Sequence, residues 1–210
     1  PMYDQVIDSL RDAYNGKVDE RDAKEIALWK AKERDHFLDA LRDKWATTAR
    51  PVRLLEIGAG TGKMGQYFQE QGLEVVCTDL SPSMVEACRQ KGLDAREMDF
   101  LSLDFDDHAF DAVFALNTLL HVPKADFETV LRSIARVLKP DGLFYLGQYG
   151  GNDFEGSHDN DHYYPKRFFS HFTDDAIRNA VAQVYEITYF EIVSFDPKET
   201  GEKSYNFQSF

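Results

Sequence analysis

The stretch LLEIGAGTGK, residues 54–63, decides the fold class of this chain. It begins with a short apolar run that is typical of a buried strand, and it continues into a turn that contains Gly58, Gly60 and Gly62. A turn of this kind between a strand and a helix brings bare backbone N–H groups and the positive end of the helix next to a ligand. The stretch therefore predicts an α/β domain that binds a nucleotide-like cofactor.

The position of one acid indicates which cofactor. The pattern Gly60-x-Gly62-x-x-Gly65 alone also matches a dinucleotide fingerprint, so this pattern leaves NAD(P) open. Glu56, however, stands at the end of the strand and ahead of the turn. A carboxylate there would repel a pyrophosphate, but it would attract a cofactor that carries an ammonium group. The order of the acid and the glycines therefore favours S-adenosylmethionine (SAM) over NAD(P).

From residue 51 onward, short apolar runs alternate with helical periods, which is typical of a parallel sheet built from βα units. We expect a Rossmann-like, seven-stranded, mostly parallel sheet with helices on both faces and an antiparallel C-terminal hairpin strand. The polar segment 150–172 is predicted to be a long loop over one face. The predicted strands are 52–57, 73–78, 95–98, 109–116, 143–148, 184–193 and 203–210, and the predicted helices are 63–71, 82–91, 124–138 and 173–182.

The segment before this alternation is predicted to be helical. Residues 2–45 indicate two helices that are broken near Asn15 and Gly16, the second with one apolar face and with Asp19 as its cap. We therefore divide the chain into an N-terminal helical cover, residues 1–50, and a cofactor-binding core, residues 51–210.

Five motifs occur in order along the core. They are LLEIGAGTGK, the strand end Thr78-Asp79-Leu80, the pair Asp99-Phe100, the run FDAVFALNTLLHVP at 110–123, and LKPDGLFYL at 138–146. Together they resemble the class I SAM-dependent methyltransferases, and among these the small-molecule methyltransferases of bacteria. The resemblance covers about residues 52–210, and it implies in-line transfer of a methyl group from SAM to an N, O, S or C atom, with S-adenosylhomocysteine (SAH) as the product.

The resemblance also implies which residues hold the cofactor. Asp79 corresponds to the acid that takes both ribose hydroxyls, for which one carboxylate suffices because it can accept two hydrogen bonds. Asp99 and its neighbouring backbone correspond to the adenine site. Trp29 is placed either against the cofactor or in the core. The full set of expected cofactor contacts is Glu56, Gly58, Ala59, Gly60, Thr61, Gly62, Asp79, Leu80, Met84, Asp99, Phe100, Leu116, Asn117, Tyr14 and Trp29.

The acceptor side of the site is less defined. His121 is a weak candidate for a catalytic base, and the alternative is a helix-entry residue before Pro123. Asn117 lacks the Pro-Pro-aromatic sequence with which amino methyltransferases of bases or glutamine hold a planar amide, so those substrates are disfavoured. His158 and His162 have no third ligand, so no metal is predicted. The residues expected to face the acceptor are His121, Tyr149, His162, Tyr163 and Tyr164.

Composition limits the partners. The chain has 24 Lys and Arg against 37 Asp and Glu, a formal charge of −13, which disfavours nucleic acids and anionic membranes and favours neutral or cationic acceptors. Two cysteines and the lack of a signal or membrane-spanning segment predict a soluble, cytoplasmic protein. The acceptor and the oligomeric state are not predicted. The rival hypotheses are an NAD(P)-dependent oxidoreductase and a non-catalytic SAM-binding module.

Overall fold

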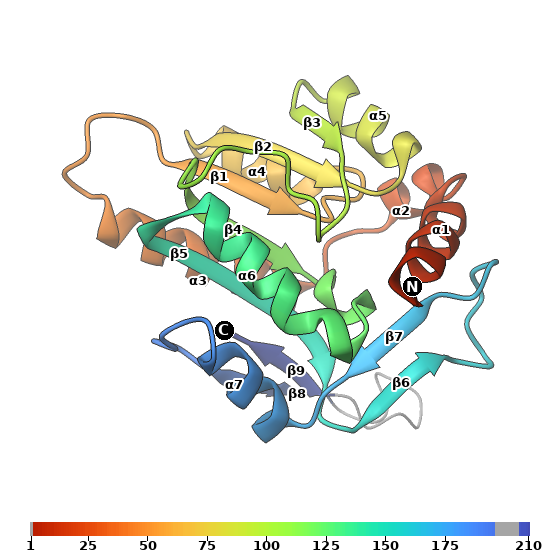
Figure 1. Cartoon of the computed structure of the whole chain (residues 1–210). Helices are drawn as coiled ribbons and strands as arrows, with labels where there is room; N and C mark the ends of the chain where they lie inside the picture. Colours follow the sequence, from red (N-terminus) through yellow and green to blue (C-terminus); the bar gives the residue numbers. More distant parts are fainter. Residues whose placement is uncertain (1, 196–205) are drawn as a thin grey trace.

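The computed structural model describes residues 2–195 and 206–210, and it contains one large sheet (Figure 1). The seven strands lie in the order β3-β2-β1-β4-β5-β9-β8. The first five are parallel, and β9 runs antiparallel to both β5 and β8. This arrangement confirms the predicted fold class. The strands are β1 (Arg53–Ile57), β2 (Glu74–Asp79), β3 (Asp94–Glu97), β4 (Phe110–Leu116), β5 (Leu138–Gly150), β8 (Glu191–Ser194) and β9 (Asn206–Ser209).

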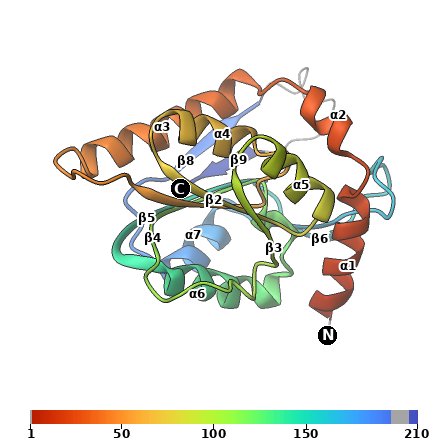
Figure 2. The same ribbon diagram turned by 90° about the horizontal axis from the view of Figure 1, so that it is seen from above.

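Helices cover both faces of this sheet (Figure 2). α3 (Leu28–Lys44), α4 (Lys63–Glu70) and α5 (Pro82–Gln90) pack on one face, and α6 (Phe127–Val137) and α7 (Asp174–Ala182) pack on the other. Each face buries its own apolar cluster, and β4 contributes to both clusters because its residues alternate between the two faces. The sheet is thus the rigid support on which the strand ends present their side chains.

The N-terminal segment forms three helices, where the sequence predicted two. They are α1 (Met2–Tyr14), α2 (Val18–Ala23) and α3, and the break before α3 begins at the extended residue Lys24. The prediction that Asp19 caps a long helix is wrong, because Lys17 precedes α2 and no side chain caps it. α3 buries Phe37, Leu38 and Leu41, whereas α2 buries no residue.

Other local expectations meet mixed outcomes. Ser81 caps α5 by accepting a hydrogen bond from the backbone amide of Met84 at 3.4 Å, and Pro82 is the first helical residue, both as predicted. Residues 150–172 are not a plain loop, since they contain an antiparallel hairpin of β6 (Phe154–Ser157) and β7 (Phe168–His171). The predicted strand 184–193 is confined to β8, because the segment before it folds back and the Tyr185 hydroxyl donates to the carbonyl of Leu131. The connection 196–201 lies outside the described residues.

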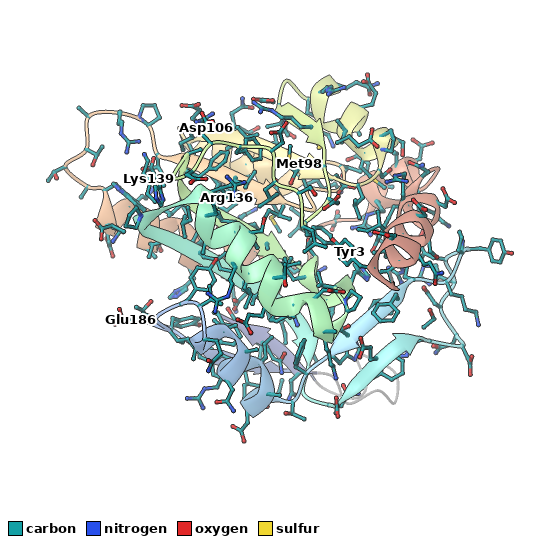
Figure 3. The ribbon with its side chains drawn as sticks, in the orientation of Figure 1. Tyr3, Met98, Asp106, Arg136, Lys139 and Glu186 are labelled. Atoms are coloured by element: carbon teal, nitrogen blue, oxygen red, sulfur yellow. The ribbon has the colours of Figure 1, made fainter. Side chains whose placement is uncertain are left out.

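β5 differs from the prediction at its start. It takes in the expected turn 139–142, with an irregular register opposite Phe110 and Ala112 of β4. Near this point Asp111, 1% exposed, accepts hydrogen bonds from Arg50 and Lys139. Although burial alone would raise the pKa of Asp111, these bonds hold it well below its ordinary value. Lys139 lies at the opposite end of the molecule from α1 (Figure 3), so this ion cluster stabilises the fold far from the glycine turn.

The side chain of Tyr3 attaches the first helix to the core. Tyr3 lies on the side of α1 that faces the sheet (Figure 3) and joins the same apolar cluster as Phe100 and Leu103. α1 is therefore fixed beside the carboxyl ends of the strands.

None of the helices in the described part of the chain is long and apolar enough to cross a membrane.

Candidate active site

The glycine turn between β1 and α4 adopts the conformation that glycine favours. Gly58, Gly60 and Gly62 have φ angles of 69°, 56° and 81°. The amides of Gly58 and Ala59 donate to the carbonyl of Thr78 at 2.8 and 3.0 Å, and the amide of Gly62 donates to Ala59 at 2.9 Å. These amides are therefore used inside the protein, contrary to the expectation of bare N–H groups. The turn helps a ligand chiefly by letting it approach the backbone.

The three glycines are required for different reasons. A Cβ on Gly58 would lie 2.2 Å from the Thr118 Oγ1, and one on Gly62 would lie 2.9 Å from the Cys88 Sγ. At Gly60 the nearest atoms belong to the flexible side chain of Arg21, at 3.7 Å. Gly58 and Gly62 are thus needed because a side chain would overlap their neighbours. Gly60 has room for a Cβ, and its φ of 56° is what favours glycine there.

Gly60 borders a cavity of about 310 Å³ at the carboxyl ends of β1, β2 and β4, under α1 and α2. The carboxyl ends of parallel strands are where α/β sheets bind ligands. Many residues selected from the sequence line it, namely Tyr14, Glu56, Gly58, Ala59, Gly60, Thr61, Asp79, Leu80, Met84, Phe100, Leu116, Asn117 and His121. Residues that sequence reasoning missed also line it, namely Leu10, Arg21, Lys24, Glu25, Ile26, Lys30, Lys63 and Met64. Thr118, next to Asn117, lines it too.

Asp79 connects the end of β2 to the glycine turn. Its Oδ2 accepts a hydrogen bond from the Gly60 amide at 2.8 Å, and its Oδ1 accepts one from the Ser81 amide at 2.9 Å. Burial raises the pKa of this carboxyl, while the two amides and the charge of Arg21 act in the opposite direction. Asp79 therefore both shapes the turn and presents its oxygens to the cavity.

Glu56 is the more deeply buried acid of the cavity. It is 4% exposed, and the Cys77 Sγ donates to its Oε2 at 3.5 Å. Burial raises the pKa of Glu56 to about 8, although the contacts with Cys77 and the Gly65 amide partly oppose this. The carboxyl thus holds its proton more tightly than an exposed glutamate does, and a cation beside it favours the charged form.

Asn117 provides an unused acceptor at the end of β4. It has a φ of 53°, which is unusual outside glycine, and its amide donates to the carbonyl of Gly147 at 2.7 Å. Its Oδ1 atom is buried and finds no hydrogen-bond partner in residues 2–195 and 206–210. A buried oxygen of this kind favours a ligand or water that donates to it.

Asp99 and Trp29 lie elsewhere than the cavity wall. The Asp99 Oδ1 accepts from the amides of Leu101 and Ser102 at 2.7 and 2.8 Å, and only its neighbour Phe100 lines the cavity. The Trp29 ring packs edge-on against Phe207, with 4.6 Å between ring centroids. Trp29 is half-buried and packs outside the set of residues that line the cavity. Gly62 likewise lies behind the wall.

His121 lines the cavity, but both of its ring nitrogens already have hydrogen-bond partners inside the protein. Its Nδ1 is 2.6 Å from the carbonyl oxygen of Phe168, and its Nε2 is 3.0 Å from the Tyr14 hydroxyl. Since a carbonyl can only accept, Nδ1 carries the proton and the Tyr14 hydroxyl donates to Nε2. Arg167 in turn donates to the Tyr14 oxygen at 3.3 Å and is paired with Asp161 at 2.8 Å.

We expect His121 to stay neutral over the whole physiological range. Burial lowers its pKa to about 3, with the positive charges of Arg167 and Arg21 acting in the same direction. In a histidine NMR titration from pH 5 to 8, the imidazole signal that disappears in the variant His121→Gln should not move. A His121 signal with a midpoint near 6.5 would contradict the hydrogen-bond pattern.

The remaining acceptor-side candidates surround α2 and the β6–β7 hairpin. The Tyr163 hydroxyl accepts from Arg21 at 3.4 Å, and Arg167 stacks 3.7 Å from the centre of its ring. His162 lies 3.8 Å from Glu20, and Tyr164 is 90% exposed. Tyr149 packs near Trp29, so none of these four lines the cavity. In the described ranges no three His, Cys, Asp or Glu side chains form a cluster that could hold a metal.

A parallel sheet with a glycine turn and two strand-end acids in one cavity defines an α/β protein with a nucleotide-type cofactor site. Residues 55–146 match the family described as a methyltransferase domain. Two relatives are similar to this part of the chain. They are a ubiquinone biosynthesis O-methyltransferase of Xanthomonas oryzae pv. oryzae, 34% identical over 102 residues, and a demethylmenaquinone methyltransferase of Thermus thermophilus, 39% identical over 107 residues.

The matches span 45% and 47% of this chain but only 42% and 48% of the two relatives, so less than half of each relative is covered. A solved SAM-dependent methyltransferase of Methanosarcina mazei is similar over 80% of this chain and 94% of its own, with a TM-score of 0.67 and 20% identity. At that identity the likeness shows the fold. Residues 55–146 thus match the methyltransferase family, and the fold of the chain is that of a solved SAM-dependent methyltransferase.

Proposed function

We propose that this protein transfers a methyl group from SAM to a small-molecule acceptor and releases SAH. The observation that carries this proposal is the meeting of the glycine turn, Glu56 and Asp79 in one cavity within the matched domain. The named activities of the quinone-biosynthesis relatives support a small acceptor.

The residues of the cavity fit the chemistry of SAM. Asp79 offers carboxylate oxygens to two ribose hydroxyls, and Glu56 offers a carboxyl to an ammonium group. Asn117 offers its unpartnered Oδ1 to a donor. Apolar side chains suited to a flat base come from Leu10, Leu80, Met84 and Phe100. We keep Asp99 as a proposed adenine contact through its neighbouring backbone.

When bound, SAM supplies an electrophilic methyl on a sulfonium, which a nucleophile can displace. The protein then needs to align the acceptor and to exclude water. α1 and α2 serve the second task, because Lys91 ties Asp22 of α2 to the turn carbonyl of Thr61, and Asn15 accepts from Ser81 at 2.6 Å. The hydrogen bond from the Tyr14 hydroxyl to Nε2 of His121 fixes the position of both side chains beside the cavity.

Cofactor binding is expected to release a proton from Glu56. Its pKa of about 8 keeps the free carboxyl mainly protonated at pH 7, and an adjacent ammonium would lower that pKa below 7. Calorimetric titration of SAH at pH 7 in buffers of different ionisation enthalpy should therefore show release of up to about one proton. In Glu56→Gln, which cannot ionise, the buffer dependence should vanish. An equal buffer dependence in the variant would place the proton elsewhere.

The proposed function is tested by SAH binding and by methyl transfer. SAH should raise the melting temperature, and tritium from methyl-labelled SAM should enter an acceptor. Nicotinamide absorbance changes with NAD(P)H would instead support the oxidoreductase rival, and SAH binding without any turnover of amines, phenols, thiols or acids would support the binding module. No thermal shift at millimolar SAH would overturn the proposal.

Several finer statements remain predictions. The division into a cover, residues 1–50, and a core, residues 51–210, is our proposal, as are a cytoplasmic location and the lack of nucleic-acid partners. A net charge of −13 supports the last of these.

A further inference from the structure

The cavity carries a charge opposite to that of the whole protein. Four cationic side chains line it, Arg21, Lys24, Lys30 and Lys63, against the three acids Glu25, Glu56 and Asp79. The wall thus holds one more cationic side chain than acidic side chains. The lining is thus net positive inside a chain with a formal charge of −13.

Two of these cations form no close ion pair in the described part of the chain, although the charge of Arg21 already acts on Asp79. No ion pair within residues 2–195 and 206–210 involves Arg21 or Lys30, whereas Lys24 lies 4.0 Å from Glu20. Arg21 donates to the Tyr163 hydroxyl and lies 5.2 Å from the centre of the Tyr14 ring. Burial lowers the pKa of Lys30, and the charges of Arg21 and Lys24 add to this. A half-buried cation without a counter-ion is costly, so the site favours an incoming anion.

The proposed cofactor does not supply the missing charge. SAM carries one carboxylate, one ammonium and one sulfonium, so it brings a net charge of +1. Its carboxylate can pair with one cation of the cavity, such as Arg21, whose side chain lies 3.7 Å from the position of a Cβ on Gly60. Ionised Glu56 offsets the ammonium, so the sulfonium adds one positive charge to a wall that already has more cations than acids. This balance favours an anion as the second ligand.

We propose that the methyl acceptor is an organic anion, with a carboxylate or similar acidic group bound by Lys30. This rests on the proposed function and names its substrate class. The apolar side chains of Ile26, Met64 and Leu116 in the same wall suit an acceptor whose acidic group is attached to an apolar body. The expectation of a neutral or cationic acceptor, drawn from the net charge of the chain, is thereby reversed, because the local charge decides what enters a cavity.

The test compares benzoate with benzamide, which share a ring and differ in charge. Each is titrated by calorimetry or ligand-observed NMR into the protein saturated with SAH. We expect benzoate to bind at least about fivefold more tightly than benzamide. Lys30→Gln should abolish this preference while changing the SAH dissociation constant less than about twofold. Lys32→Gln is the matched control, since it removes the same charge from an exposed position of α3 outside the cavity wall.

Each outcome decides the question. A benzoate preference that Lys30→Gln removes and Lys32→Gln retains supports the proposal. Equal affinities for benzoate and benzamide, binding of neither, or an equal loss in both variants would overturn it. Failure of SAH itself to bind would instead refute the proposed function, so the two failures are distinguishable. The melting temperature of each variant without ligand shows whether it is folded.

Discussion

Replacing Gly58 with alanine is expected to destabilise the protein by about 2–4 kcal/mol, because strain and overlap act together. The residue has a φ of 69°, and an added Cβ would lie 2.2 Å from the Oγ1 and 2.5 Å from the Cγ2 of Thr118. Thr118 cannot easily move aside, since it is 5% exposed and its hydroxyl donates to the carbonyl of Ile57 at 3.1 Å. Urea unfolding followed by circular dichroism measures the loss.

Gly72→Ala is the matched control for Gly58→Ala. Gly72 has a φ of 91°, but nothing lies within 4 Å of the position of its Cβ. This variant should therefore show only the backbone cost, about 1 kcal/mol. An equal loss in both variants would mean that Thr118 yields, and the close contact at Gly58 would not be what fixes the turn.

The local pattern of the sequence sufficed for the central sheet. The apolar run before Gly58 predicts β1, and Ser81-Pro82 predicts the start of α5. Both signals are local, so they do not depend on contacts with distant parts of the chain. The helix α2 has no such signal, because it buries no side chain and is held by polar contacts such as that of Asp22 with Lys91. The β6–β7 hairpin was missed because its strands have only four residues each, too few to show a hydrophobic periodicity.

The residues of the candidate site also differ in how far the sequence predicts them. Residues at strand ends, such as Glu56 and Asp79, could be predicted because parallel strands bring their carboxyl ends to one edge. Arg21 and Lys30 could not, because a basic residue on a helix usually faces solvent, and only the fold turns these two toward the cavity. Lys63 follows the glycine turn directly, and that position was the one signal for a cation there. Trp29 shows the opposite case, because its aromatic ring was a candidate from the sequence but packs against Phe207 and does not line the cavity.

Replacing Asp79 with asparagine is expected to weaken SAH binding by at least about tenfold, measured by calorimetry at pH 7. Both carboxylate oxygens already accept from backbone amides, and an oxygen has lone pairs left for ribose hydroxyls. The side chain of asparagine has only one oxygen, and its nitrogen cannot accept a hydrogen bond. The variant therefore has one acceptor atom fewer for the backbone amides of Gly60 and Ser81 and for the ribose hydroxyls.

Asp94→Asn is the control for charge alone, since Asp94 lies exposed on β3 beside Arg96 and away from the cavity. It should leave the SAH affinity within about twofold of the parent. The melting temperature without ligand separates the two roles of Asp79. If Asp79→Asn lowers that temperature but binds SAH as the parent does, the carboxylate only holds the turn. If affinity falls while the ligand-free protein stays folded, the carboxylate also binds the cofactor, because the loss then appears only when SAH is present.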